Sequence, residues 1–125
     1  MRVALYARVS KDDDQTPENQ LDILRELATR RGYDVAGEYV DRASGKDPNR
    51  PAWKELMEVA RRHDVDAIIA VRVDRIMRSV VHLSDTLGKL EAYRVALIFS
   101  DMDYDPGTPS GQLMINIVGA IAQWE

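Results

Sequence analysis

The amino-acid sequence predicts an α/β domain with a mainly parallel central sheet, helices on both faces, and the start of a long helix at its C-terminal end. Two observations lead to this fold class. Four short apolar runs rich in β-branched residues alternate with amphipathic helical patterns. The runs are nearly continuous in their apolar character, which is typical of strands covered on both faces, and such strands form mainly parallel sheets.

The expected strands cover residues 3–9, 35–40, 67–73 and 95–99. The first helix begins at Pro17, after an N-cap at Thr16, and ends at Gly32. Its apolar residues recur at helical spacing and form one buried stripe: Leu21, Leu24, Leu27 and Ala28.

Three further helices are expected. The second begins near Pro51 and places Trp53, Leu56, Met57 and Ala60 on one face, and the third runs from about Ser79 through Leu83, Leu87 and Leu90. The fourth opens at Thr108-Pro109, and its apolar stripe runs to Trp124 without a stop signal. This ending predicts that the chain is a fragment of a longer protein.

Composition narrows the possible functions. A length of 125 residues fits a single domain, residues 1–125. The absence of cysteine excludes a disulfide framework, a thiol nucleophile and a cysteine-ligated zinc site. A net charge of −4 argues against a free-standing module that holds DNA by electrostatics alone. With no signal peptide and no apolar run near the ~20 residues that span a bilayer, we expect a soluble protein without membrane contact, and the lack of cysteine is compatible with a reducing cytoplasm.

The stretch from Tyr6 to Ser10 is the first candidate site. Arg8 and Ser10 stand where a buried strand opens into a loop. A serine hydroxyl beside a guanidinium suits nucleophilic attack on an anionic target such as a phosphodiester. The alternative is that both side chains simply face solvent at a strand end.

A second cluster follows the third strand and contains Asp74, Arg75 and Arg78. The two arginines are three residues apart and share a face in any helical turn, while Asp74 can orient one of them. The first and third strands of a parallel sheet often lie side by side, and ligands bind beyond their carboxyl ends, so we expect this cluster near Ser10. The alternative is a set of surface charges that balance the acidic residues.

The segment of residues 41–51 is polar and long for a connection in so small a domain, which is typical of a mobile functional loop that would bring Arg50 to the site. The alternative is a loop that is merely solvated. Ser44 in this loop is a second, lower-ranked candidate nucleophile. The acidic run Asp12–Asp14 has no recurring ligand spacing, so it indicates a solvated turn and not a metal site. His63 and His82 are isolated and are expected on helix surfaces.

Together these features resemble the catalytic domain of the serine recombinases, the resolvase and invertase family, over essentially all 125 residues. The matching motifs are separated along the chain and lie in the family's order: Tyr6 to Ser10, Gln20, Asp41 with Ser44, Gly45 and Arg50-Pro51, Asp74-Arg75 with Arg78 and Ser79, and Thr108-Pro109 with Gly111.

The resemblance implies a chemistry. Ser10 would attack a DNA phosphodiester to give a 5′-phosphoserine linkage and a free 3′ hydroxyl, and reversal after strand exchange would reseal the DNA without metal, ATP or another cofactor. Arginines would neutralise the scissile phosphate: Arg8, Arg75 and Arg78, joined by Arg50 as its loop orders. Tyr6 and Gln20 would support the site, and Asp74 would be a proton donor or an arginine orienter.

The resemblance also implies partners. The full-length protein would act on a double-stranded recombination site as a homodimer that pairs into a homotetramer, in a bacterial or phage setting. A longer dimerising helix and a DNA-binding region would follow Glu125, so the fragment alone would neither bind a site tightly nor recombine. Two rivals stay open: a binding or signalling domain in which Asp12–Asp14 accept phosphate or metal, and an inactive recombinase relative that bridges DNA.

Overall fold

The computed structural model describes residues 1–9, 17–42, 50–71 and 80–100, with the backbone alone for residues 80–84. Within these residues four strands form one sheet: β1 (Arg2–Val9), β2 (Asp34–Arg42), β3 (Ala67–Ala70) and β4 (Ala96–Phe99). Three described helices alternate with them: α1 (Pro17–Arg31), α2 (Pro51–Arg61) and α3 (Val80–Tyr93). The expected α/β class is confirmed.

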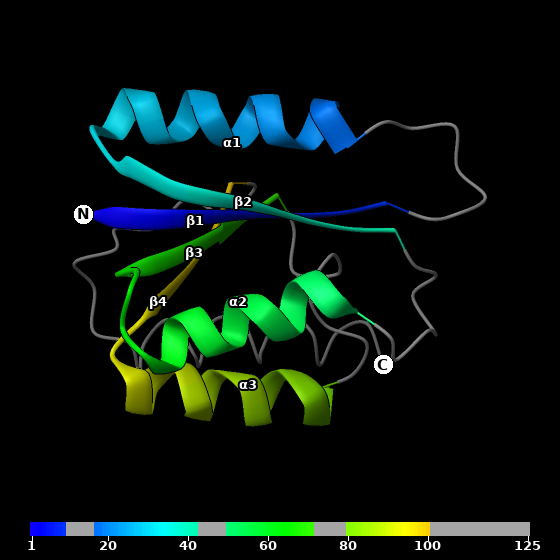
Figure 1. The fold of residues 1–125 in the computed structure, drawn as a ribbon, viewed down its shortest axis with the longest axis vertical. Helices are drawn as coiled ribbons and strands as arrows, with labels where there is room; N and C mark the ends of the chain where they lie inside the picture. Colours follow the sequence, from blue (N-terminus) through cyan, green and yellow to red (C-terminus); the bar gives the residue numbers. More distant parts are fainter. Residues whose placement is uncertain (10–16, 43–49, 72–79, 101–125) are drawn as a thin grey trace.

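The sheet is parallel at all three pairings, and its strand order is β2-β1-β3-β4. Helix α1 covers one face, and α2 and α3 cover the other (Figure 1). Strands β1 and β3 are neighbours, as the sequence predicts, with Val3 opposite Ala67 and Tyr6 opposite Ala70. The chain adds strands in one direction from β1 and then in the other, so the strand order reverses between β1 and β3.

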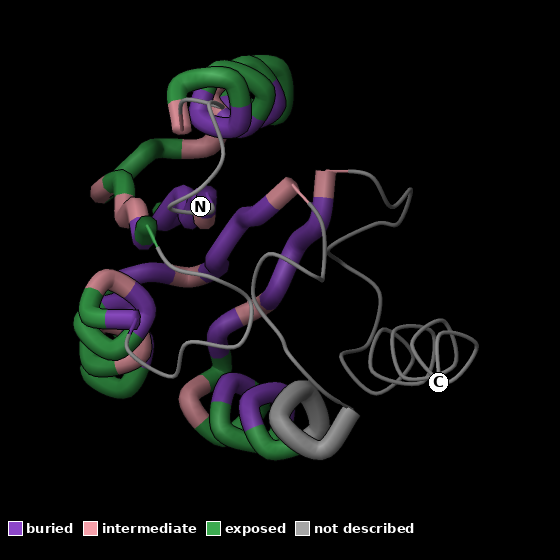
Figure 2. The backbone as a smooth tube through the Cα atoms, turned by 90° about the vertical axis from the view of Figure 1, so that its right-hand side faces the viewer, coloured by how far each residue is buried: buried purple, intermediate pink, exposed green. Residues whose placement is uncertain are grey.

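Each face of the sheet has its own apolar core. The face under α1 joins β1 to the predicted helix stripe through Leu5, Leu21 and Leu24, and the opposite face packs Tyr6 and Phe99 against α2 and α3. Buried residues line the strands and the inner sides of the helices in Figure 2. Each large aliphatic side chain buried here contributes roughly 1.5–3 kcal/mol.

Local signals set the limits of α1. Proline at the first helical position needs no amide partner, and Pro17 opens the helix as expected. Gly32 ends it with φ +73, a left-handed conformation that costs glycine little. The Tyr33 N–H then donates to the Ala28 carbonyl at 2.8 Å, which is the pairing expected of such a helix end.

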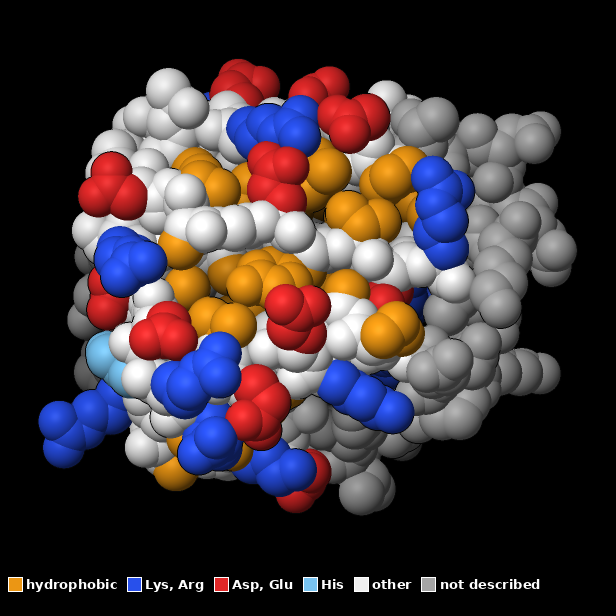
Figure 3. Space-filling view, in the orientation of Figure 1, with side chains coloured by type: hydrophobic (Ala, Val, Ile, Leu, Met, Phe, Trp, Pro, Cys, Tyr) orange, Lys and Arg blue, Asp and Glu red, His pale blue; other side chains and the backbone are white. Residues whose placement is uncertain are grey.

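Strand β2 differs from the prediction. It lies at one edge of the described sheet, as β4 does at the other, but most residues of β2 are exposed or half-buried, whereas β1, β3 and β4 are mainly buried. The expectation that all four runs are covered on both faces is therefore wrong for β2. In Figure 3 the band over β2, between α1 and α2, shows apolar side chains among charged ones of both signs.

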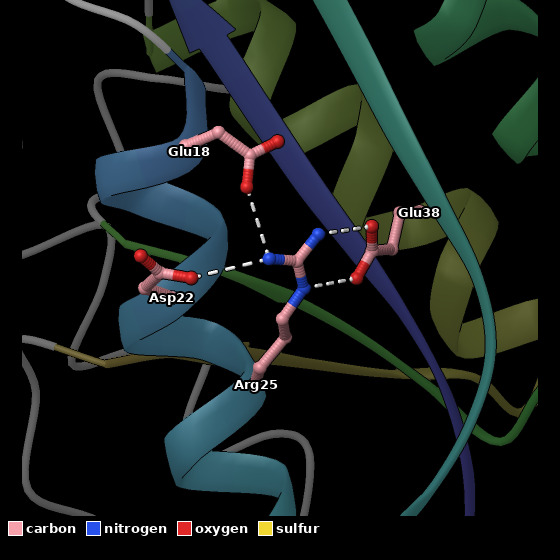
Figure 4. A network of polar contacts seen from close by, with 4 residues as sticks. All are labelled: Glu18, Asp22, Arg25 and Glu38. Atoms are coloured by element: carbon pink, nitrogen blue, oxygen red, sulfur yellow. Dashed lines mark hydrogen bonds and ion pairs between the residues drawn. The ribbon is translucent and has the colours of Figure 1, made fainter.

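A cluster of charged side chains connects α1 to β2. Arg25 of α1 donates from Nε and Nη2 to the two carboxylate oxygens of Glu38 on β2, at 2.6 and 2.8 Å, and from Nη1 to Glu18 and Asp22 (Figure 4). The pairing lowers the pKa of Glu38 and raises that of Arg25. The group is exposed, so salt screens it, and each of these ion pairs contributes little to stability.

The structure also corrects the predicted bounds of two strands. Strand β2 extends through Arg42, so Asp41 belongs to the strand and not to the polar loop. Strand β3 ends at Ala70, before the expected Val73, which lies outside the described residues. His63 is exposed but follows α2 in a turn with φ 57, and the side chain of His82 is not described. The expected fourth helix, residues 108–124, also lies outside the described residues.

Candidate active site

The candidate site lies at the carboxyl ends of β1 and β2, on the face covered by α2. Figure 2 looks onto this edge of the sheet. Tyr6 and Arg8 are two residues apart on β1 and so lie on one face of the strand, and Asp41 is the register partner of Arg8 on β2. The carboxyl ends of parallel strands are the usual place of ligand sites in open α/β sheets, and the point where the strand order reverses lies on the other side of β1, between β1 and β3.

Asp41 joins three elements. Its Oδ2 accepts hydrogen bonds from the Tyr6 hydroxyl at 2.8 Å and from the Trp53 N–H at 2.9 Å, and its Oδ1 accepts from the Ala52 N–H at 2.9 Å. The carboxylate is 2% exposed. It thus connects β1, the end of β2 and the first turn of α2, where a negative charge is favoured by the helix dipole.

Arg50 lies at the N-cap of α2 and is 4% exposed. Its carbonyl accepts the first helical hydrogen bond from the Lys54 N–H at 3.0 Å. The expectation that Arg50 belongs to a mobile loop is therefore corrected, because the residue is buried at a helix start.

Gln20 holds the backbone of Arg8. Its Nε2 donates to the Arg8 carbonyl at 2.9 Å, and its Oε1 accepts from the Arg8 N–H at 3.3 Å. The pairing of β1 with β3 ends at Tyr6, whereas its pairing with β2 continues. At Arg8 the Gln20 side-chain amide therefore bonds to backbone groups of β1 that β3 no longer pairs. Gln20 thereby fixes the strand end from which Arg8 projects and which Ser10 follows in sequence.

The Tyr6 hydroxyl is held in its protonated form. Burial is the main cause that raises the pKa of Tyr6, and the hydrogen bond to Asp41 and the charge of Asp41 raise it further, against an opposing effect of the Arg50 guanidinium. The ring is fully buried and meets Trp53 edge to face, with centroids 5.1 Å apart. Tyr6 is therefore a hydrogen-bond donor at neutral pH and not a base or nucleophile.

The raised pKa of Tyr6 predicts a loss of stability at alkaline pH. Above about pH 10 the unfolded chain releases the Tyr6 proton while the folded chain retains it, so stability is fully present below this pH and falls as pH rises, by about 1.4 kcal/mol per pH unit for one proton. The Tyr6→Phe variant lacks this proton. Urea unfolding at pH 8 to 11 should show the gap between wild type and variant narrowing above pH 10; parallel curves would contradict the assignment.

Gln20 gives a second stability prediction. The Gln20→Ala substitution removes both bonds to the backbone of Arg8 and is expected to lower the free energy of unfolding by about 1–3 kcal/mol. Gln20→Glu retains an acceptor for the Arg8 N–H but no donor for its carbonyl, so it should lie between alanine and wild type. Chemical denaturation at neutral pH measures the free energy of unfolding of both variants. Equal stability of all three proteins would show that the two Gln20 hydrogen bonds do not stabilise the fold.

The structure brings together four of the eight predicted site residues: Tyr6, Arg8, Gln20 and Arg50. The other four lie outside the described residues: Ser10, Asp74, Arg75 and Arg78. The same holds for Ser44 and for the acidic run of residues 12–14. The proximity of the second arginine cluster to Ser10 accordingly stays a prediction.

Asp41 was missing from the predicted site residues, although it belongs to the motif that carries the resemblance. A signal for it exists in the sequence. Pro51 marks a helix start, yet the preceding Arg50 is not a capping residue. A helix with this start needs an acceptor from elsewhere, and an acid directly after an apolar strand is a candidate.

In the part of the chain that the structure describes, no group of three His, Asp or Glu side chains is placed to hold a metal ion. The described helices are too short or too polar to cross a membrane.

Comparison with known proteins decides the family. The family model described as "Resolvase, N terminal domain" matches residues 3–125. The chain belongs to this resolvase family. A probable DNA-invertase of Sinorhizobium fredii is 35% identical over 124 residues, 99% of this chain and 38% of the relative, and the Tn501 resolvase of Pseudomonas aeruginosa is 30% identical over 96% of this chain and 60% of its own length. The chain thus spans less than two thirds of the length of each of these relatives.

Solved structures agree with the family. The N-terminal catalytic domain of TP901-1 integrase has a TM-score of 0.78 at 27% identity and is covered to 95%, with 99% of this chain. A resolvase family site-specific recombinase from Streptococcus pneumoniae has a TM-score of 0.79 at 25% identity, over 98% of this chain and 86% of that one. The resolvase fold described above is therefore that of serine recombinase catalytic domains.

Proposed function

We propose that this chain is the catalytic domain of a site-specific DNA recombinase, in which Ser10 is the nucleophile. The observation that supports it is the resolvase family match over residues 3–125, together with the placement of two arginines, Arg8 and Arg50, at the strand edge that Ser10 follows in sequence. Guanidinium groups hold phosphate oxygens in fixed directions, which suits a site that acts on a phosphodiester.

The proposed reaction is a transesterification. Ser10 Oγ forms a bond to phosphorus and loses its proton, while the bond from phosphorus to the 3′ oxygen breaks and that oxygen leaves as a hydroxyl. The product is a 5′-phosphoserine linkage. A 3′ hydroxyl then attacks this linkage, releases Ser10 and restores the phosphodiester, so no external energy source enters the balance.

Arg8, Arg75, Arg78 and Arg50 share one proposed role. They stabilise the negative charge that the equatorial phosphoryl oxygens carry in the transition state, which is the main requirement of phosphoryl transfer. Asp74 orients an arginine or donates the proton to the leaving oxygen. Tyr6 and Gln20 hold the strand end and the start of α2, by the hydrogen bonds described above.

The proposed partners are a double-stranded recombination site and further copies of the protein. In the native-length protein, a homodimer bound to one site pairs with a second dimer to form the tetramer in which strands are exchanged. DNA binding by regions outside this chain would account for its net charge of −4.

The test is recovery of the covalent intermediate. Cells that express the native-length protein are lysed under denaturing conditions, the protein is captured, and the attached DNA and the linked peptide are identified by sequencing and mass spectrometry. We expect DNA joined through its 5′ phosphate to the peptide that contains Ser10, with a 3′ hydroxyl that a polymerase can extend. Linkage to another residue, a 3′-phosphate linkage, or no adduct would overturn the proposal.

A further inference from the structure

Three elements meet at one carboxylate that the proposed chemistry does not use. We infer that Asp41 is the positioning residue for Arg50: it anchors the start of α2 to the end of β2, and it acts on the reaction through the place it gives Arg50. This inference rests on the proposed function. It assigns Asp41 no proton transfer and no contact with DNA.

The first turn of α2 needs an acceptor from outside the helix. Pro51 has no N–H, and the Arg50 side chain makes no capping hydrogen bond at the N-cap position. The next two amides, of Ala52 and Trp53, point to the two carboxylate oxygens of Asp41, each at 2.9 Å. Asp41 is thus a helix cap supplied from the preceding strand, a role usually filled by the residue at the N-cap itself.

The position of Asp41 is itself fixed. The Tyr6 hydroxyl, on a fully buried ring, donates to Asp41 Oδ2 at 2.8 Å. The three donors occupy three of the roughly four lone-pair sites of the carboxylate. A group bonded in this way and 2% exposed is suited to hold other groups in place.

The hydrogen bonds of Asp41 also restrict the position of Arg50. Eight residues separate Asp41 from Arg50 in the sequence, and the bonds to Ala52 and Trp53 bring the end of β2 to within two residues of Arg50. The Arg50 guanidinium also lies close enough to the Tyr6 hydroxyl to act on its pKa. The same carboxylate therefore fixes both the backbone that carries Arg50 and a side chain beside it, and groups held in advance contribute more to a transition state than groups that must be ordered.

A double-mutant cycle tests the inference in the native-length protein, on the DNA site that the adduct experiment identifies. We expect Asp41→Ala to slow DNA cleavage about 10–100-fold, and Asp41→Ala with Arg50→Ala to be within about threefold of Arg50→Ala alone, because both changes remove the same contribution. Losses that multiply in the double variant would show that Asp41 acts independently of Arg50 and would overturn the inference.

The conservative variant separates capping from proton transfer. Asparagine is as good a cap as aspartate and retains one carbonyl oxygen for an α2 amide, but it cannot act as an acid or base. Asp41→Asn should therefore recover at least about tenfold of the activity that Asp41→Ala loses. Hydrogen exchange of the Ala52 and Trp53 amides should be fast for both in Asp41→Ala, whereas the amide that donates to the retained carbonyl oxygen should stay protected in Asp41→Asn. Equal activity of the two variants would contradict the inference.

A control at the other end of the strands accounts for simple destabilisation. Asp66 also accepts a backbone hydrogen bond, from the Arg2 N–H at 2.9 Å, but its side chain is exposed and lies at the amino ends of β1 and β3. Asp66→Ala should leave the cleavage rate within about threefold of wild type, and a loss as large as that of Asp41→Ala would assign the effect to stability alone. A Ser10-linked adduct in the wild-type protein, alongside any of these contrary results, would overturn only the role of Asp41 and leave the proposed function standing.

Discussion

The Ser10→Ala variant of the native-length protein is expected to form no covalent adduct with DNA and to cleave at least about 10⁴-fold more slowly than wild type. Alanine has no Oγ, so the bond to phosphorus cannot form. The arginines that bind the phosphate are unchanged, and DNA binding in a gel shift should therefore stay close to that of wild type. Quantifying adducts on denaturing gels measures the first effect.

Ser44→Ala is the matched control for this prediction. Ser44 is the other serine that the sequence offers as a nucleophile, and it lies in the polar segment before α2. Loss of the adduct in Ser10→Ala with retention in Ser44→Ala would assign the nucleophile to Ser10. An adduct that survives in Ser10→Ala and disappears in Ser44→Ala would assign the nucleophile to Ser44. Ser10 is preferred because it directly follows a strand, which favours preorganisation of its hydroxyl.

Local signals explain why much of this fold is predictable. Pro17 and Gly32 mark the two ends of α1 through backbone properties that depend on no distant residue. The continuous apolar runs of β1 and β3 predict two covered faces and a parallel sheet, and their pairing follows from the usual order of such folds. In each case the deciding interaction is close in sequence or general to the fold class.

The errors arise where distant residues decide. Asp41 looks like the start of a polar loop, but the Tyr6 hydroxyl and two α2 amides draw it into the sheet and bury it. Arg50 follows this polar segment and so looks like a loop cation. The hydrogen bonds between Asp41 and the first turn of α2 place Arg50 at the N-cap of the helix. The run that forms β2 suggests a strand covered on both faces, yet most of its residues are exposed or half-buried, because coverage depends on elements distant in the sequence.

Arg50→Ala is the second prediction with a large expected effect. We expect it to slow DNA cleavage by the native-length protein about 10²–10³-fold, the usual cost of removing one preorganised group that stabilises transition-state charge. Arg50→Lys retains the charge but not the planar fork that pairs with two phosphate oxygens, so it should recover only part of the rate. Single-turnover cleavage on the identified site measures both variants.

The fold should survive this substitution, which makes the prediction specific. Asp41 still accepts from Tyr6, Ala52 and Trp53 when Arg50 is alanine, so the start of α2 stays anchored to the sheet. Arg31→Ala is the control. Arg31 is the last residue of α1 and is exposed, so this change removes an equal charge, and the variant should cleave DNA within about threefold of the wild-type rate. If Arg50→Ala cleaves as fast as Arg31→Ala, then Arg50 contributes no transition-state stabilisation, and its burial at the strand edge serves the fold alone.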